Sequence, residues 1–187
     1  MLHGFLLFPT SRDWLLVLFK RLEVLTQNKY ATQLTCARYR CNVFLEMCTL
    51  MMDTADPYFP PSRIARGLLV HSLVAMHLLP LHLLQPSSID FIAWRMLFAA
   101  GQPEGARATS SCMLENDSLD IFVEQVQASV GADLIMLTED SIHMAIFMRD
   151  AFHLMRSWNH IRYIQRVQQI NCYTDNQLEA YICSSNI

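Results

Sequence analysis

The segment from Gly67 to Leu84, GLLVHSLVAMHLLPLHLL, decides our expectation for the fold, because it contains no Asp, Glu, Lys or Arg. Its apolar residues are distributed around the whole circumference of a helix, which is typical of a helix buried on every side or embedded in lipid. The sequence therefore predicts a hydrophobic central helix over residues 64–79. Pro61 suits the first turn of this helix, and Pro80 is expected to end or kink it.

The composition of the 187 residues is that of a folded chain, with 52% hydrophobic and 17% charged residues. This balance argues against intrinsic disorder and allows a sizeable core. We expect one all-α domain over residues 1–187, a globular bundle of about seven helices around the central one. The segment 101–112 has no apolar periodicity and is expected to be a flexible loop.

Helix signals flank the central segment on both sides. Thr10 and Asp13 have the spacing of a capping box for a helix over 11–26, and apolar residues at steps of three and four predict a helix over 30–52. The other expected elements are a helix over 89–100, a helix capped by Asn116 or Asp117 and stopped by Gly131, a short strand or buried turn over 134–137, a helix from Thr138 to about Ile170 and a short helix from Thr174.

The cysteine pattern and the N-terminus both favour an intracellular protein. None of the six cysteines forms a Cys-x-x-Cys pair, so we expect buried, reduced thiols that behave as small hydrophobic side chains. The first residues lack the positive leader and cleavage site of a secretory signal. A reducing compartment, cytoplasm or nucleus, is therefore expected, and the histidines and Pro80 in the central segment argue against a membrane span.

Charge is distributed unevenly in the C-terminal part of the chain. Residues 108–148 contain seven acids and no Lys or Arg, whereas four arginines follow by residue 166. On the expected helix 139–170, steps of four and three residues form one cationic edge, which Arg162 and Gln169 broaden. This edge is consistent with a solvated helix face, with a docking site for an acidic protein, or with a phosphate-binding surface. The candidate partner-binding residues are Arg149, His153, Arg156, His160, Tyr163 and Arg166.

The sequence contains no motif that specifies a chemistry, and we assign no catalytic, cofactor-binding or metal-ligating residue. Two Asp-x-x-His pairs occur, at 140–143 and 150–153, but a di-metal bundle also needs acids from neighbouring helices. A Gly-rich phosphate loop, a Gly-x-Ser-x-Gly elbow and a His-Glu-x-x-His motif are absent. A Cys–His nucleophile pair stays open, because distant residues can be neighbours in the fold. Three histidines are expected in the core or at its rim: His71, His77 and His82.

These observations favour a non-catalytic helical interaction, adaptor or regulatory protein, which binds its partner through a hydrophobic groove or the basic edge. One alternative is a nucleic-acid-binding protein that uses Arg149, Arg156, Arg162 and Arg166. A second alternative is a membrane-associated protein, either Bcl-2-like or with transmembrane helices. A central hydrophobic helix wrapped by six others is similar to the Bcl-2-like fold, and the scale of the domain is similar to that of the cyclin fold. No Asn-Trp-Gly-Arg stretch is present, and no family is assigned.

Overall fold

The structure is a computed structural model that describes residues 9–51, 60–100 and 114–157. These ranges contain α-helices and one short 3-10 helix and no strand, which confirms the all-α prediction. The final helix expected from Thr174 and the loop expected over 101–112 lie outside the described residues, so the count of about seven helices and the single domain stay predictions. The elements are α1 (Ser11–Leu25), α2 (Ala31–Met51), α3 (Pro61–Ala75), η1 (Leu81–Leu84), α4 (Phe91–Ala100), α5 (Asn116–Val130) and α6 (Leu134–Ser157).

The first two helices form as their sequence signals predict. The Thr10 hydroxyl oxygen accepts the Asp13 backbone N–H at 3.2 Å, and the Asp13 carboxylate accepts the Thr10 N–H at 2.8 Å. This reciprocal capping box satisfies backbone donors at the start of α1. On α2, the positions at steps of three and four are buried, which confirms the predicted packing seam: Leu34, Ala37, Cys41, Phe44 and Cys48.

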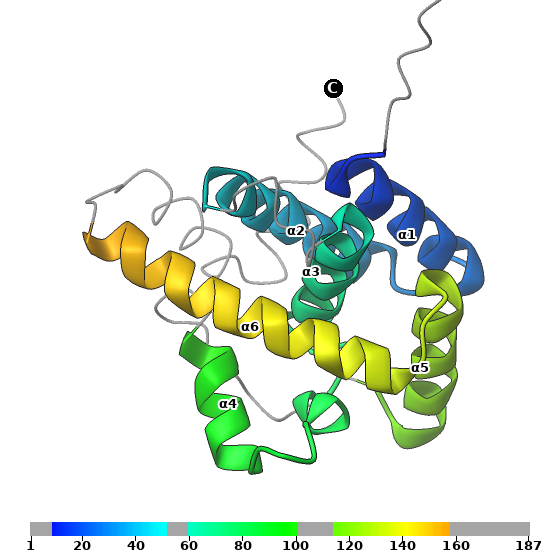
Figure 1. Ribbon diagram of the computed structural model, residues 1–187. Helices are drawn as coiled ribbons and strands as arrows, with labels where there is room; N and C mark the ends of the chain where they lie inside the picture. The colour runs from blue at the N-terminus through cyan, green and yellow to red at the C-terminus, as the bar shows by residue number, and fades with distance from the viewer. Residues whose placement is uncertain (1–8, 52–59, 101–113, 158–187) are drawn as a thin grey trace, which may run out of the picture.

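Helix α3 packs against α1, α2 and α6 (Figure 1). Pro61 lies in its first turn, as predicted, because the missing N–H of proline needs no partner there. The helix covers 61–75, in place of the predicted 64–79. Its buried residues are Ala65, Gly67, Leu68, Leu69, Val70, His71, Ser72, Leu73 and Val74.

The end of α3 differs from the prediction, because the helix stops four residues before the expected position. His77 takes a left-handed backbone conformation with φ 59°. Its N–H donates to the Val74 carbonyl at 3.0 Å, and the Leu78 N–H donates to the Leu73 carbonyl at 3.0 Å. These two bonds form a Schellman C-cap, which usually uses glycine at the left-handed position. Pro80 therefore occupies the N-cap position of η1 and takes no part in α3.

The short helix α4 is fixed at its start and along its length. The Asp90 carboxylate accepts the backbone N–H groups of Ile92 at 2.9 Å and Ala93 at 3.0 Å. Trp94 is buried and its indole N–H donates to the Leu81 carbonyl of η1 at 3.2 Å. Since α4 also packs on α6, its orientation in the fold is determined on two sides (Figure 1).

The boundaries of α5 and α6 correct two predictions. Asn116 and Asp117 lie within the first turn of α5, and Glu115 occupies the cap position without a side-chain bond. Gly131 ends α5 with φ 64°, as predicted. No strand forms over 134–137, because α6 begins at Leu134 and not at Thr138. The Asp133 carboxylate caps α6 by accepting the Met136 N–H at 2.8 Å.

Candidate partner-binding surface

The predicted basic edge is described only at its beginning. The Arg149 side chain is 47% exposed, and its Nε donates to the Asp150 carboxylate at 2.8 Å. This hydrogen bond raises the pKa of Arg149 above its ordinary value. His153 and Arg156 lie in the last turns of α6. His160, Arg162, Tyr163 and Arg166 lie outside the described residues. The basic edge therefore stays a prediction.

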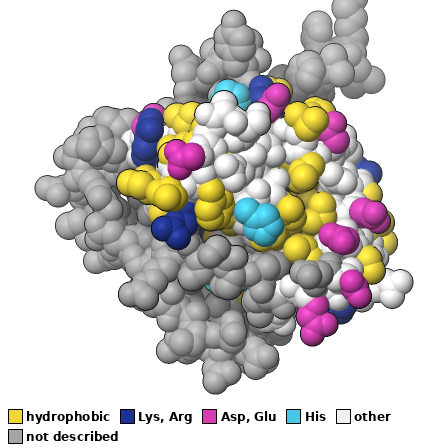
Figure 2. Space-filling view, turned by 90° about the horizontal axis from the view of Figure 1, so that it is seen from below, with side chains coloured by type: hydrophobic (Ala, Val, Ile, Leu, Met, Phe, Trp, Pro, Cys, Tyr) yellow, Lys and Arg dark blue, Asp and Glu magenta, His cyan; other side chains and the backbone are white. Residues whose placement is uncertain are grey.

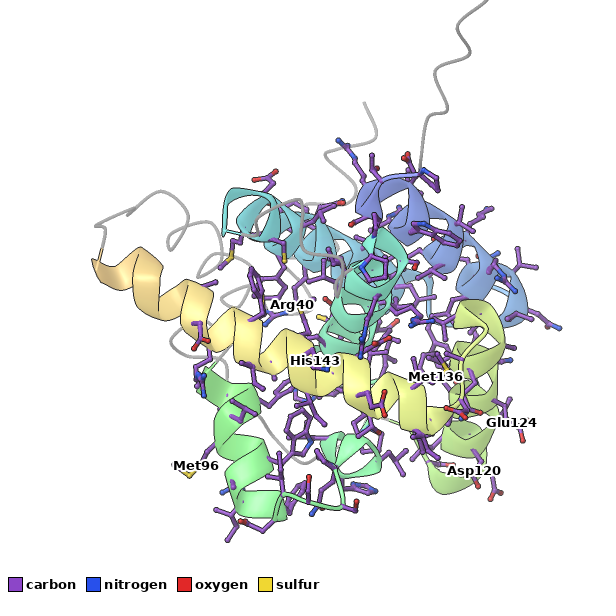
Figure 3. The ribbon with its side chains drawn as sticks, in the orientation of Figure 1. Arg40, Met96, Asp120, Glu124, Met136 and His143 are labelled. Atoms are coloured by element: carbon purple, nitrogen blue, oxygen red, sulfur yellow. The ribbon has the colours of Figure 1, made fainter. Side chains whose placement is uncertain are left out.

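The solvent-facing side of α4 is apolar, which the sequence reading did not single out. Ile92 is 65% exposed and Met96 is 67% exposed, whereas Trp94 and Phe98 on the opposite side are buried. Arg95 is the one charged residue among the ten of this helix, and it is exposed. In Figure 3 the Met96 side chain extends away from the body of the molecule. Large hydrophobic side chains this exposed are typical of a contact surface when they lie together.

The same side of the molecule shows further hydrophobic side chains. Figure 2 views the molecule from below, where α4, η1 and α5 follow one another, and hydrophobic side chains extend across this face. Acidic side chains gather at the end of the face formed by α5. Helix α6, on which α4 packs, exposes Ile146 and, three residues later, Arg149. We call Ile92, Arg95, Met96, Ile146 and Arg149 the α4–α6 surface.

A group of polar side chains is buried between α2 and α3. The Cys41 thiol donates to the Ser72 hydroxyl at 3.1 Å and lies 3.3 Å from the Leu68 carbonyl. Arg40 is buried beside it, with its guanidinium 4.8 Å from the centre of the Phe44 ring. Burial lowers the pKa of Arg40 to about 10 and raises the pKa of Cys41 to about 12.

His71 lies in the same part of the core, between two aromatic rings. Its ring centre is 4.3 Å from that of Phe98 and 5.6 Å from that of Phe44. Burial, with a smaller contribution from Arg40, lowers the pKa of His71 to about 3. Both His71 and Cys41 are therefore neutral near pH 7. Burial is what raises the pKa of Cys41, and a raised pKa is typical of a cysteine that packs in the core.

The contact between α3 and α6 contains a buried ion pair that the sequence reading missed. Asp140 lies in the second turn of α6, because this helix begins at Leu134 and not at the predicted Thr138. Its side chain is 2% exposed and accepts the Nε–H groups of Arg63 at 2.5 Å and Arg66 at 2.8 Å. The spacing of the two arginines, three apart on α3, is the only sequence signal of this arrangement.

The buried carboxylate changes the interpretation of the first Asp-x-x-His pair. Asp140 points into the contact with α3, whereas His143 is exposed on α6. The two side chains of this pair therefore do not define a common site. In the three described ranges, no group of three or more His, Cys, Asp or Glu side chains is placed to hold a metal ion.

The chain matches no protein-family model, and it is similar to no curated protein and no solved structure in the comparisons made. Among the described residues no single helix is both long and apolar enough to cross a membrane. One pair passes that test of length and composition together, Asp117–Val130 with Leu134–Ala151, and these helices are bent by 77° relative to each other.

Proposed function

We propose that this protein is a non-catalytic interaction protein, an adaptor or regulator that binds a protein partner through the α4–α6 surface. In this proposal α3 is the fixed hydrophobic centre on which the partner-binding helices are held. In the same proposal the predicted basic edge, of which Arg149 is the described beginning, extends this surface.

One observation carries the proposal: α4 turns two large hydrophobic side chains, Ile92 and Met96, into solvent at about two thirds exposure. A short helix with so little charge gains nothing in stability from this exposure, because burying such side chains is what contributes to folding. A partner that covers them gains that free energy instead. Methionine suits such a surface, since its flexible thioether adapts to partners of different shape.

The charges next to these side chains indicate the character of the partner. Arg95 lies between Ile92 and Met96 along α4, and Arg149 lies on the solvent-facing side of α6. A partner with an apolar segment and neighbouring acidic side chains would therefore be complementary. We place the apolar contact on the exposed side of α4, in place of the hydrophobic groove expected from the sequence.

The proposal is tested with two matched pairs of substitutions. A photo-crosslinking residue at position 92 or 96 identifies the partner in the native cell, and binding of the purified partner is then measured by calorimetry. Ile92→Ser with Met96→Ser should weaken binding by at least about tenfold at an unchanged melting temperature. Ile135→Ser with Met136→Ser removes the same two residue types from the exposed start of α6 and should leave affinity unchanged. Equal affinities for the two variants contradict the proposal.

The nucleic-acid alternative uses Arg149, Arg156, Arg162 and Arg166 and makes a different prediction. Binding to phosphates releases counterions, so it weakens steeply as salt rises. In the described part of α6 the Arg149 side chain is paired with Asp150, which reduces its attraction for phosphates. Salt-dependent retention on a heparin column that is lost in Arg149→Ala with Arg156→Ala would favour this alternative over the α4–α6 surface.

A further inference from the structure

The methionines in the described part of the chain differ widely in their exposure. Met47, Met144 and Met148 are buried, with at most 1% of their surface exposed. Met96 on α4 is 67% exposed, and Met136 in the first turn of α6 is 43% exposed. A peroxide oxidises the thioether sulfur of a methionine only where it can reach the side chain. In the folded protein, Met96 is therefore the most accessible of these five methionines to an oxidant.

The two exposed methionines lie in different parts of the molecule. Figure 3 labels both: Met96 extends away from the body of the molecule on α4, whereas Met136 lies at the end of α6 beside α5. Met96 follows Ile92 by one helical turn, so these two side chains share the exposed side of α4. Met96 therefore belongs to the α4–α6 surface, and Met136 is a control with the same chemistry outside it.

Oxidation of Met96 would change the exposed side of α4 without changing its packing. The inner side of α4 is formed by Trp94 and Phe98, which are both buried, and the Trp94 indole N–H is bonded to the Leu81 carbonyl. The oxygen of a sulfoxide at position 96 would remain hydrated in the unbound protein. We therefore expect oxidation of Met96 to alter the surface of the protein and to leave its stability unchanged.

The sequence of α4 offers no hydrogen bond to such an oxygen within the helix. The residues three and four positions from Met96 face the same side, and all of them are apolar: Ile92, Ala93, Ala99 and Ala100. A partner that covers a sulfoxide here must remove its water without a donor from α4 in exchange. Burying a polar group without a hydrogen bond is costly, so oxidation should weaken the contact.

We propose that Met96 is a reversible oxidation site that regulates binding at the α4–α6 surface. The oxidation step is independent of the proposed function, and the regulation rests on it. The oxidant is a peroxide. A lone pair of the Met96 sulfur attacks one peroxide oxygen, and the S–O bond forms as the O–O bond breaks. The leaving oxygen takes up the proton and departs as water or an alcohol, so sulfur loses the two electrons that the peroxide gains. A thiol-dependent methionine sulfoxide reductase restores the thioether.

The first measurement uses the full-length protein without a partner. The protein is treated with dilute hydrogen peroxide, and peptide mass spectrometry follows sulfoxide formation at each methionine. Met96 should oxidise faster than Met136, whereas Met47, Met144 and Met148 should oxidise only when urea unfolds the chain. The melting temperature of the protein oxidised in its folded state should equal that of the untreated protein.

The second measurement uses the partner identified by crosslinking. Peroxide treatment should weaken its binding by at least about tenfold, and methionine sulfoxide reductase with a dithiol should restore it. Each variant is compared with its own untreated form. Treated and untreated Met96→Leu should bind equally, whereas Met136→Leu should lose as much affinity on treatment as the native chain. Met96→Gln places a polar side chain at this position without an oxidant and should bind as weakly as the oxidised protein.

Each part of the proposal has an outcome that overturns it. If Met96 oxidises no faster than the buried methionines, it is not the oxidation site. If Met96→Leu loses as much affinity on treatment as the native chain, other residues cause the effect. If treatment leaves affinity unchanged while Ile92→Ser with Met96→Ser weakens binding, the regulation fails and the proposed function stands. If that double variant and Ile135→Ser with Met136→Ser bind equally, the proposed function itself fails, and with it the regulation.

Discussion

Helix α6 contributes an Asp to an ion pair with α3 on its buried side, and it carries an Arg–Asp pair of its own on its solvent side. On the buried side, Asp140 is bound by Arg63 and Arg66 of α3, residues 77 and 74 positions away in the sequence. On the solvent side, Arg149 binds its neighbour Asp150, and about half of each side chain is exposed. The first pair determines which face of α6 meets α3. The second joins adjacent residues, so its side chains are available for other contacts.

The two ion pairs use the same residue types, but their different burial gives them different effects on stability. A carboxylate removed from water is costly unless charged donors bind it, and its loss leaves those donors without compensation. A pair in water gains little, since solvent screens its attraction. The buried side of α6 is therefore expected to control stability, and the exposed side is expected to control binding.

The largest predicted effect is at the buried pair. Asp140→Asn removes the charge that two guanidiniums bind, and it should lower the free energy of unfolding by about 3–5 kcal/mol. Urea denaturation followed by circular dichroism measures this loss. Asp150→Asn is the matched control on the solvent side, and its denaturation midpoint should equal that of the native chain. If the two variants unfold at the same urea concentration, burial does not distinguish the pairs.

The next largest predicted effect is a loss of stability on acidification, caused by the buried His71 of α3. Burial lowers the pKa of His71 from 6.5 to about 3 in the folded chain, so on acidification the unfolded chain takes up the proton first. The stability associated with neutral His71 is therefore lost as the pH falls from about 6.5 toward about 3, with about 2 kcal/mol lost by pH 5. Denaturation at pH 7.5 and pH 5 measures the loss. The free energy of unfolding of His71→Leu should depend less on pH. If its pH dependence equals that of the native chain, groups other than His71 cause the loss.

A smaller loss of stability is expected at Gly67, where α3 approaches α6 closely. A Cβ at Gly67 would lie 3.1 Å from the Asp140 carbonyl oxygen and 3.2 Å from the Met144 Cβ. Gly67→Ala should therefore push the helices apart and destabilise the fold by about 1 kcal/mol, after alanine's better helix propensity is included. Its effect should not add to that of Asp140→Asn, because both act on one contact. Gly131→Ala, with nothing within 4 Å of its Cβ, should be additive.

The smallest effect on stability is expected on the solvent side of α6. Arg149→Ala should leave the melting temperature unchanged, because the side chain contacts Asp150 and solvent. If the α4–α6 surface binds an acidic partner, the same variant should weaken binding and reduce its sensitivity to salt. Calorimetry at low and at physiological salt measures both the affinity and its dependence on salt. A large drop in melting temperature would instead show that Arg149 stabilises the fold. The buried and solvent sides of α6 would then not differ in their effect on stability.

Local sequence signals predicted most helices, because capping and helical periodicity depend on residues close together in the chain. The Thr10–Asp13 capping box, the seam of α2, the proline in the first turn of α3 and the stop at Gly131 all lie where the pattern indicated. Among the boundaries that were wrong, two have local reasons that the pattern did not reveal. His77 takes a conformation that is usually glycine's, and Asp133 caps α6 one turn before the expected start.

The sequence by itself determined that this chain is helical, since spacing, caps and breakers act within a few residues. Only the tertiary structure decided which polar side chains are buried and which apolar ones are exposed. Asp140 meets Arg63 and Arg66 only when α3 and α6 cross, and Ile92 and Met96 stay in solvent because Trp94 and Phe98 occupy the inner side of α4. The burial of a side chain depends on contacts between segments that are distant in the sequence. Hydrophobic periodicity predicts that a helix has an apolar and a polar face, but it does not predict which segment covers each face.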